Sequence, residues 1–99
     1  MIRHTVVFKL KHLMGSRAEL EFLQAAQKLA AIPTIKNFEC LRQISKKNRY
    51  EFGLSMEFSS VEDYEFYTDH PDHVHFVQTR WIPEVSDFME IDYELPSQV

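Results

Sequence analysis

The ten residues YTDHPDHVHF, numbers 67 to 76, combine three histidines with a tyrosine, and these side chains can do chemistry. Histidine exchanges protons near neutral pH and binds metal ions, while a tyrosine hydroxyl can donate a hydrogen bond to a carbonyl oxygen. The segment is therefore compatible with a metal site, an acid–base site or simply the start of a helix. The rest of the chain has to distinguish these three interpretations.

The spacing of the histidines disfavours a metal site. Zinc takes three or four converging nitrogen, sulfur or oxygen ligands. His73 and His75 are two residues apart, so on a regular helix their side chains point about 200° apart around the axis. Neither Cys40 nor His12 has a partner at a familiar metal-binding spacing. We therefore expect no metal and no other cofactor, and we interpret His70 as a helix-junction residue and His75 as a solvated one.

An acid–base site would involve a further histidine on the first predicted strand. His4 lies on the apolar side of residues 2–10, where an imidazole needs a hydrogen-bond partner or a cavity. If the helices that follow the third strand pack on this side, Tyr67 and His73 approach His4. Around an apolar pocket, these three residues suit general acid–base chemistry. The competing interpretation is that they are core residues whose hydrogen bonds are satisfied internally.

The strands and helices that must position these residues follow from the hydrophobic pattern. Period-two alternation predicts strands at 2–10, 35–44, 50–58 and 85–95. Between them, capping boxes predict two helix starts, Ser16 with Glu19 and Ser59 with Glu62, and prolines mark helix boundaries at positions 33, 71 and 83. The order β-α-β-β-α-β predicts a ferredoxin-like α+β fold, in which an antiparallel four-stranded sheet carries helices on one face.

The face of the sheet without helices is predicted to be polar and to tolerate water, which permits a monomer. We expect it to be lined by Arg3, Thr5, Lys9, Leu41, Gln43, Glu51, Ser55, Glu57, Phe88 and Glu90. On the last strand, Met89, Ile91, Tyr93 and Leu95 are expected to point the other way. Because the first and third strands are neighbours in this topology, opposite charges could pair across them.

Composition limits the class of protein. The chain has 99 residues, 44% of them hydrophobic and 13% aromatic, with a formal charge of −4, which is typical of one globular domain over residues 1–99. No basic stripe indicates nucleic-acid binding, and no apolar run approaches a membrane span. The single cysteine excludes an intramolecular disulfide, and the chain starts without a signal peptide. We therefore expect a cytoplasmic protein with neither nucleic acid nor membrane as partner.

Several segments together resemble a known family. They are IRHTVVFKLK at the start, EFGLSMEFSSVEDYEFY in the middle, then HPDHVHFV and FMEIDYE. Over essentially the whole chain they resemble the stress-responsive A/B barrel (Dabb) family, and the combination of RH in the first strand with HPxH is the most specific part. The resemblance implies a homodimer in which two sheets face each other to form a dimeric α/β barrel, with residues 92–99 helping to clasp the partner.

One branch of that family is similar to olivetolic-acid-type polyketide cyclases, which close a linear polyketide by aldol condensation without a cofactor. Its catalytic positions hold His4, Tyr67 and His73 here. The resemblance implies that His73 is the general base, that Tyr67 polarises the carbonyl and that His4 orients the substrate. Asp72 and His75 depart from the cyclase pattern, and we expect both to add polarity close to the candidate base.

Two functions of different class remain open. The first is a homodimer that binds a small ligand without chemistry. The second is a cofactor-independent cyclase or lyase that acts on an enolisable carbonyl compound. A related interpretation is a heme monooxygenase with a histidine as axial ligand, although no residue specifically supports heme. In each case we expect bulky pocket walls that leave little room for an alkyl chain, formed by Phe22, Leu23, Phe76, Val77 and Trp81.

Overall fold

The fold alternates strands with two helical regions, and the computed structural model describes residues 1–96. The strands are β1 (Ile2–Leu10), β2 (Lys36–Arg42), β3 (Phe52–Phe58) and β4 (Val85–Glu94). The first helical region comprises α1 (Arg17–Gln27) and the 3₁₀ turn η1 (Lys28–Ala31). The second comprises α2 (Val61–Asp69), α3 (Pro71–Phe76), the π-helical turn η2 (Val77–Trp81) and α4 (Ile82–Glu84). The predicted order β-α-β-β-α-β is confirmed.

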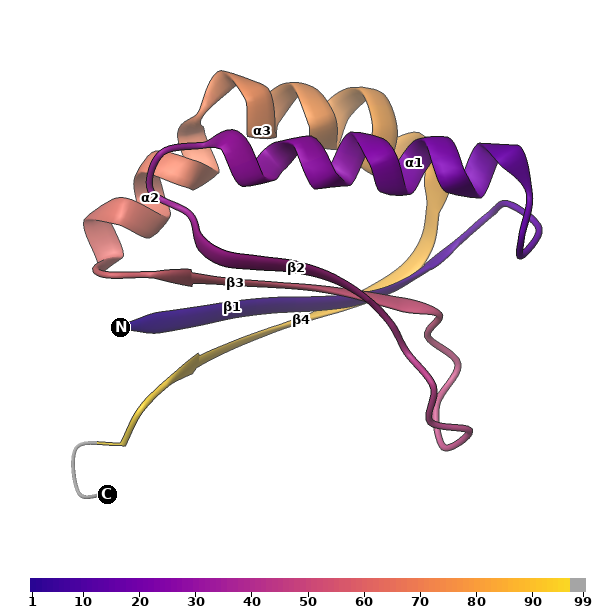
Figure 1. Ribbon diagram of the computed structural model, residues 1–99, viewed down its shortest axis with the longest axis horizontal. Helices are drawn as coiled ribbons and strands as arrows, with labels where there is room; N and C mark the ends of the chain where they lie inside the picture. Colours follow the sequence, from indigo (N-terminus) through magenta and orange to yellow (C-terminus); the bar gives the residue numbers. More distant parts are fainter. Residues whose placement is uncertain (97–99) are drawn as a thin grey trace.

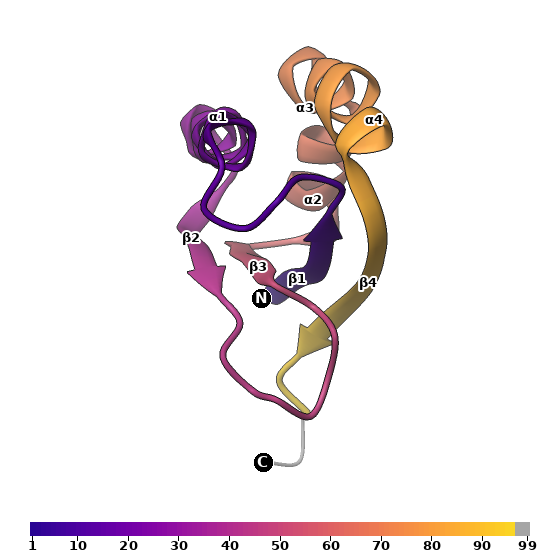
Figure 2. The ribbon, with the colours of Figure 1, turned by 90° about the vertical axis from the view of Figure 1, so that its right-hand side faces the viewer.

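The four strands form one antiparallel sheet in the order β2-β3-β1-β4. The helices all cover the same face of this sheet, and the opposite face carries none (Figure 1). Viewed from the end, α1 lies over the β2 side, while α3 and α4 lie over the β4 side (Figure 2). The ferredoxin-like α+β prediction is therefore confirmed, including the neighbouring positions of the first and third strands.

The core lies between the sheet and the helices. Its largest fully buried side chains are Phe8, Phe22, Phe52, Met56 and Phe58. Even-numbered residues of β1 and β3 point toward the helices because side chains alternate along a strand. Burying a side chain of this size stabilises the fold by about 1.5–3 kcal/mol. The same alternation places His4 on the helix side of β1, where it is 7% exposed.

Local sequence signals define most of the helix boundaries. Ser16 caps α1, since its Oγ accepts a hydrogen bond from the backbone N–H of Glu19 at 3.2 Å, as predicted. Pro71 begins α3, also as predicted. Pro83 does not end the second helical region, because it occupies the first turn of α4, where its missing N–H costs no hydrogen bond. That region ends one residue later, at Glu84.

The predicted cap of α2 is wrong by one residue. Ser60, not Ser59, caps the helix, and its Oγ accepts from the backbone N–H of Asp63 at 3.1 Å. Each serine is followed three residues later by an acidic residue, so the sequence signal fits both. The Ser59 hydroxyl instead accepts a hydrogen bond from the ammonium group of Lys36, at the start of β2.

Strand β4 is turned over relative to the prediction. Its register with β1 pairs Phe88 with Phe8, Glu90 with Val6 and Asp92 with His4, so these three β4 residues face the helices. The intervening residues lie on the open face of the sheet: Met89, Ile91 and Tyr93. The prediction placed the more apolar side of β4 inward, but apolar residues occupy both of its sides. Backbone pairing with β1 decides which side faces the core.

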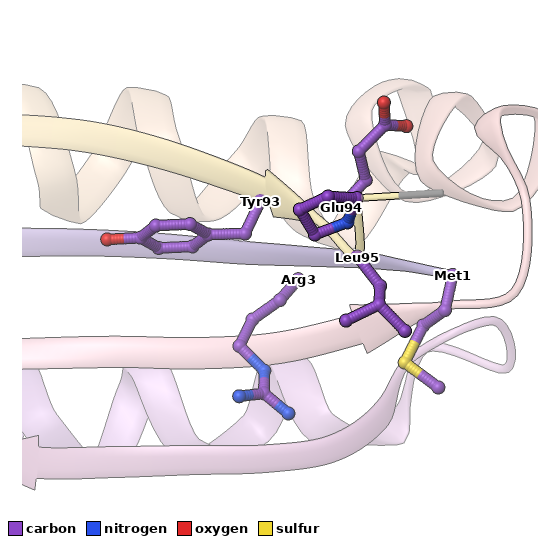
Figure 3. A pocket seen from close by; sticks show the side chains of 6 residues that line it. Met1, Arg3, Tyr93, Glu94 and Leu95 are labelled. Carbon is purple, nitrogen blue, oxygen red and sulfur yellow. The ribbon is translucent and has the colours of Figure 1, made fainter. Parts of the chain in front are cut away.

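The open face is consequently less polar than expected. Arg3 and Glu57 form an ion pair across β1 and β3, as opposite charges on neighbouring strands can. The same face carries exposed apolar side chains: Leu41, Met89, Ile91 and Tyr93. At one end, Met1, Arg3, Tyr93 and Leu95 border a hollow of about 510 Å³ (Figure 3). Exposed apolar side chains gathered on one face of a sheet are typical of an interaction site. Of the predicted partner clasp at 92–99, residues 97–99 lie outside the described part of the chain.

Candidate functional site

His4 is held in place by two polar side chains from other elements. Its Nδ1 lies 2.6 Å from Oδ1 of Asp92, the residue paired with it on β4. The hydroxyl of Tyr64, on α2, donates to the second carboxylate oxygen of Asp92 at 2.8 Å, and its oxygen is also 2.8 Å from Nδ1 of His4. Because a carboxylate only accepts hydrogen bonds, Nδ1 of His4 carries a proton. In the neutral ring, Nε2 is then the free acceptor.

Tyr67 and His73 come together above His4. Tyr67 is 4% exposed near the end of α2, and its ring centroid lies 4.2 Å from that of His73 on α3. The ring centroids of Tyr67 and His4 are 6.1 Å apart. Nδ1 of His73 donates to the backbone oxygen of Thr68 at 3.0 Å, so Nε2 of the neutral ring carries the free lone pair. The structure therefore brings the three predicted residues together.

The junction between α2 and α3 creates this arrangement. His70 ends α2 and caps α3, because its Nδ1 accepts a hydrogen bond from the backbone N–H of Asp72 at 3.1 Å. Its extended backbone, favoured before a proline, redirects the chain so that the first turn of α3 returns over the end of α2. The prediction that His70 is a junction residue is confirmed. His75 is exposed, as expected.

Burial controls the protonation of these groups. It raises the pKa of the Tyr67 hydroxyl, and the nearby carboxylate of Glu90 raises it further. Burial lowers the pKa of His73, although the hydrogen bond to Thr68 partly opposes this effect. At neutral pH, Tyr67 is thus a hydrogen-bond donor, while His73 is a neutral acceptor. A donor and a base side by side can polarise a carbonyl and remove a neighbouring proton.

Two cavities meet at these residues. One, of about 350 Å³, lies between the sheet and the second helical region, and the other, of about 380 Å³, lies beside α2. Both are lined by His4, Tyr67, His73 and Glu90. The larger part of the first cavity's wall is apolar, and its volume falls at the small end of the range for ligand pockets. The bulky wall residues thus leave more room than expected.

The predicted wall residues divide into two groups. Phe76, Val77 and Trp81 line the first cavity, together with Val6 and Phe88. Phe22 and Leu23 do not, because α1 lies over the β2 side of the sheet. Phe22 is instead fully buried in the core, and Leu23 packs against that core.

Asp72 and His75 lie away from the cavity, contrary to expectation. They line a separate groove of about 410 Å³ between α1 and the second helical region, which also includes Lys28 and Arg80. On a helix, residues one before and two after His73 point away from its side. The two departures from the cyclase pattern therefore add no polarity to the cavity wall around His73.

Sequence reasoning missed three residues of the candidate site: Tyr64, Glu90 and Asp92. Glu90 and Asp92 were placed on the wrong side of β4, so their approach to His4 was not foreseen. Pairing β4 with β1 in register would have found them, since it puts an acidic residue directly beside a histidine. Tyr64 lies three residues before Tyr67 on α2, and this spacing indicates a shared helix face.

Metal binding and membrane insertion find no support in the part of the chain that the structure describes. Among residues 1–96, no three histidine, cysteine, aspartate or glutamate side chains gather as a metal-binding group. In the same range, every helix is too short or too polar to cross a membrane.

Comparison with known proteins identifies the family of the chain. Residues 2–95 match the profile of the Stress responsive A/B Barrel Domain. A stress-response A/B barrel domain-containing protein of Arabidopsis thaliana is 28% identical over 95 residues, which cover 94% of this chain but 36% of the plant protein. The chain thus spans about a third of that relative's length.

Two solved structures are also similar. A Dabb family protein with a ferredoxin-like fold from Mesorhizobium loti is 56% identical, with a TM-score of 0.96 and 97% coverage of both chains. A dimeric ferredoxin-like protein of unknown function from Thermobifida fusca is 25% identical, with a TM-score of 0.79, over 95% of this chain and 90% of that one. The resemblance inferred from the sequence is confirmed, and the chain belongs to the stress-responsive A/B barrel domain family.

Proposed function

We propose that this protein is a homodimer that binds a small, largely apolar carbonyl compound in the cavity beneath α2–α4. The observation that carries the proposal is the position of Tyr67 and His73, whose rings are in contact and which both line the cavity. The buried Tyr67 hydroxyl is a hydrogen-bond donor for a carbonyl oxygen, and the apolar wall accommodates the rest of the ligand. His4, fixed by Asp92 and Tyr64, supplies a second polar contact.

The dimer is supported by the open face of the sheet. Met89, Ile91 and Tyr93 form an exposed apolar row on β4, and Leu41 is exposed on the same face of the sheet at its other edge, on β2. A second copy that faces this surface would remove these side chains from water, at about 25 cal/mol per Å² of apolar area. The similar Thermobifida fusca protein is dimeric.

A binding experiment tests the ligand proposal. 4-Phenyl-2-butanone serves as the carbonyl probe, and toluene as an apolar probe without an acceptor. We expect both to shift the NMR signals of Trp81 and Val77. Tyr67→Phe should weaken binding of the ketone about tenfold, which corresponds to one lost hydrogen bond, and leave toluene unaffected. Tyr50→Phe, a tyrosine outside the cavity, should change neither affinity. No shift at the cavity residues with either probe would refute the proposal.

A second candidate function is proton abstraction from the bound carbonyl compound. It is favoured by the hydrogen bond from Nδ1 of His73 to Thr68, which leaves Nε2 available as a base. The proton on the carbon next to the carbonyl would pass to Nε2, while Tyr67 donates a hydrogen bond to the enolate oxygen that forms. The enolate would then attack a second carbonyl in the same molecule, or take a proton back.

Deuterium exchange separates the two candidates. In D₂O, an enzyme of this kind would replace the α-protons of 4-phenyl-2-butanone faster than buffer alone. His73→Asn, which keeps a donor for the Thr68 carbonyl but has no basic nitrogen, should reduce the exchange to the buffer rate. If the wild-type protein binds the ketone without accelerating the exchange, it binds ligand but does not abstract this proton.

A further inference from the structure

The charge of the cavity walls indicates the kind of ligand they accept. Both cavities are lined by side chains from the described part of the chain that include no lysine or arginine. The acidic wall residues are Glu90, which both cavities share, and Glu65, which lines the one beside α2. A ligand carboxylate would therefore find no lysine or arginine among these wall residues, and Glu90 would repel it. Charge complementarity favours a ligand that brings its own cation.

Glu90 is placed to receive such a cation. It pairs with Val6 in the register of β4 with β1, so its side chain lies on the helix side of the sheet. It shares both cavity walls with His4, Tyr67 and His73, and it is exposed to solvent, so it marks the open side of the site. A carboxylate at the edge of an otherwise apolar cavity is a ready counter-ion for an ammonium group.

Aromatic side chains reinforce this preference. Tyr67, Phe76, Trp81 and Phe88 all line the same cavity as Glu90. The rings of Trp81 and Phe88 meet edge to face, with their centroids 5.5 Å apart. Aromatic faces attract cations through their quadrupoles, and tryptophan does so most strongly. A carboxylate combined with aromatic walls suits an organic cation with an apolar body.

We propose that the natural ligand of this cavity is a small amine whose ammonium group lies beside Glu90 and whose apolar body contacts Trp81. This inference rests on the proposed function, because it specifies the ligand of the same cavity. The Tyr67 hydroxyl remains available to donate a hydrogen bond to a carbonyl oxygen, so an amine-bearing carbonyl compound satisfies both Glu90 and Tyr67. Compounds that carry a carboxylate should bind this site more weakly than amines.

Three probes of matched shape and different charge test the proposal: phenethylamine, 2-phenylethanol and 3-phenylpropanoate. Dissociation constants come from NMR titration of the intact protein, read at the Trp81 indole N–H and at Val77. We expect the amine to bind at least tenfold more tightly than the carboxylate. Glu90→Gln should abolish this preference, with each affinity expressed relative to that of 2-phenylethanol for the same variant. The matched control, Glu62→Gln, removes one exposed charge from α2 outside both cavities and should preserve the preference.

The possible outcomes distinguish the inference about amines from the proposed ligand binding. If 2-phenylethanol binds and the amine shows no advantage, or if Glu90→Gln keeps the advantage, the inference about amines is overturned while ligand binding stands. If none of the three probes shifts Trp81 or Val77, the cavity does not bind small molecules and the proposed function fails as well. Shifts by 3-phenylpropanoate confined to Thr79 and His75, beside Lys28 and Arg80, would support the inference, because the anion would then avoid the cavity that the amine enters.

Discussion

At the scale of single residues, His73 has an environment that links protonation to stability. Burial lowers its pKa, and the positive charge on protonated His4 or His70 would act in the same direction, whereas Glu90 and the Thr68 carbonyl oppose the shift. The folded state therefore binds a proton at His73 less readily than the unfolded chain, whose histidine has a pKa near 6.5. Below that pH, protons favour unfolding.

This linkage predicts a pH-dependent contribution to stability. Above pH 6.5 the His73 contribution is flat, and as the pH falls through 6.5 the free energy of unfolding decreases, by at most about 1.4 kcal/mol per pH unit for one proton. Denaturant unfolding of wild type and His73→Asn at pH 7.5, 6.5 and 5.5 measures the difference. The wild type should lose more stability on acidification. Parallel losses in the two proteins would contradict the prediction.

The residue types in the sequence identified His4, Tyr67 and His73, but not the side chains that hydrogen-bond to His4. His4, Tyr67 and His73 could be named from the sequence because a histidine on an apolar strand face and a histidine-rich helix junction are unusual. Asp92 and Tyr64 fix His4 through contacts between residues far apart in the chain. Such contacts depend on the register of β4 and the rotation of α2, which local patterns do not determine.

At the scale of elements, the start of α2 determines where Tyr64 and Tyr67 point. The cap at Ser60 sets the first turn of the helix, and from it follows the face that meets His4. We expect Ser60→Ala to lower the free energy of unfolding by about 1 kcal/mol, because the N–H of Asp63 loses its partner.

Ser59→Ala is the matched control, since the Ser59 hydroxyl bonds an exposed lysine and does not cap the helix. It should change stability by less than about 0.5 kcal/mol. Chemical denaturation of both variants measures the two values. Equal losses would show that the helix starts elsewhere.

The element boundaries were predicted well where a local signal was strong. Ser16 and Pro71 each mark a helix start through their own backbone chemistry, and both predictions are confirmed. The side of β4 was predicted wrongly because the apolar-inward rule assumes that a strand has one buried face. In β4, Phe88 contributes to the helix side, while Met89 and Ile91 make the opposite side apolar.

At the scale of the whole molecule, the open face should be the contact between two copies. Ile91 is exposed on β4, and a charge there would be buried at the interface without a partner. We expect wild type to sediment as a dimer in analytical ultracentrifugation and Ile91→Lys to sediment as a monomer. The control, Leu20→Lys, places the same charge on an exposed leucine of α1 and should stay dimeric. A monomeric wild type would contradict the proposed dimer.

The alternation of side chains along β4 influences how the sequence of this protein can evolve. Phe88 and Glu90 face the helices and line the cavity, whereas Met89, Ile91 and Tyr93 lie on the open face of the sheet, so neighbouring positions on one strand are under different selection. Ligand preference can change through substitutions at positions 88 and 90 while assembly is maintained through 89, 91 and 93. Substitutions at positions 88 and 90 should therefore affect mainly ligand binding, whereas substitutions at positions 89, 91 and 93 should affect mainly assembly.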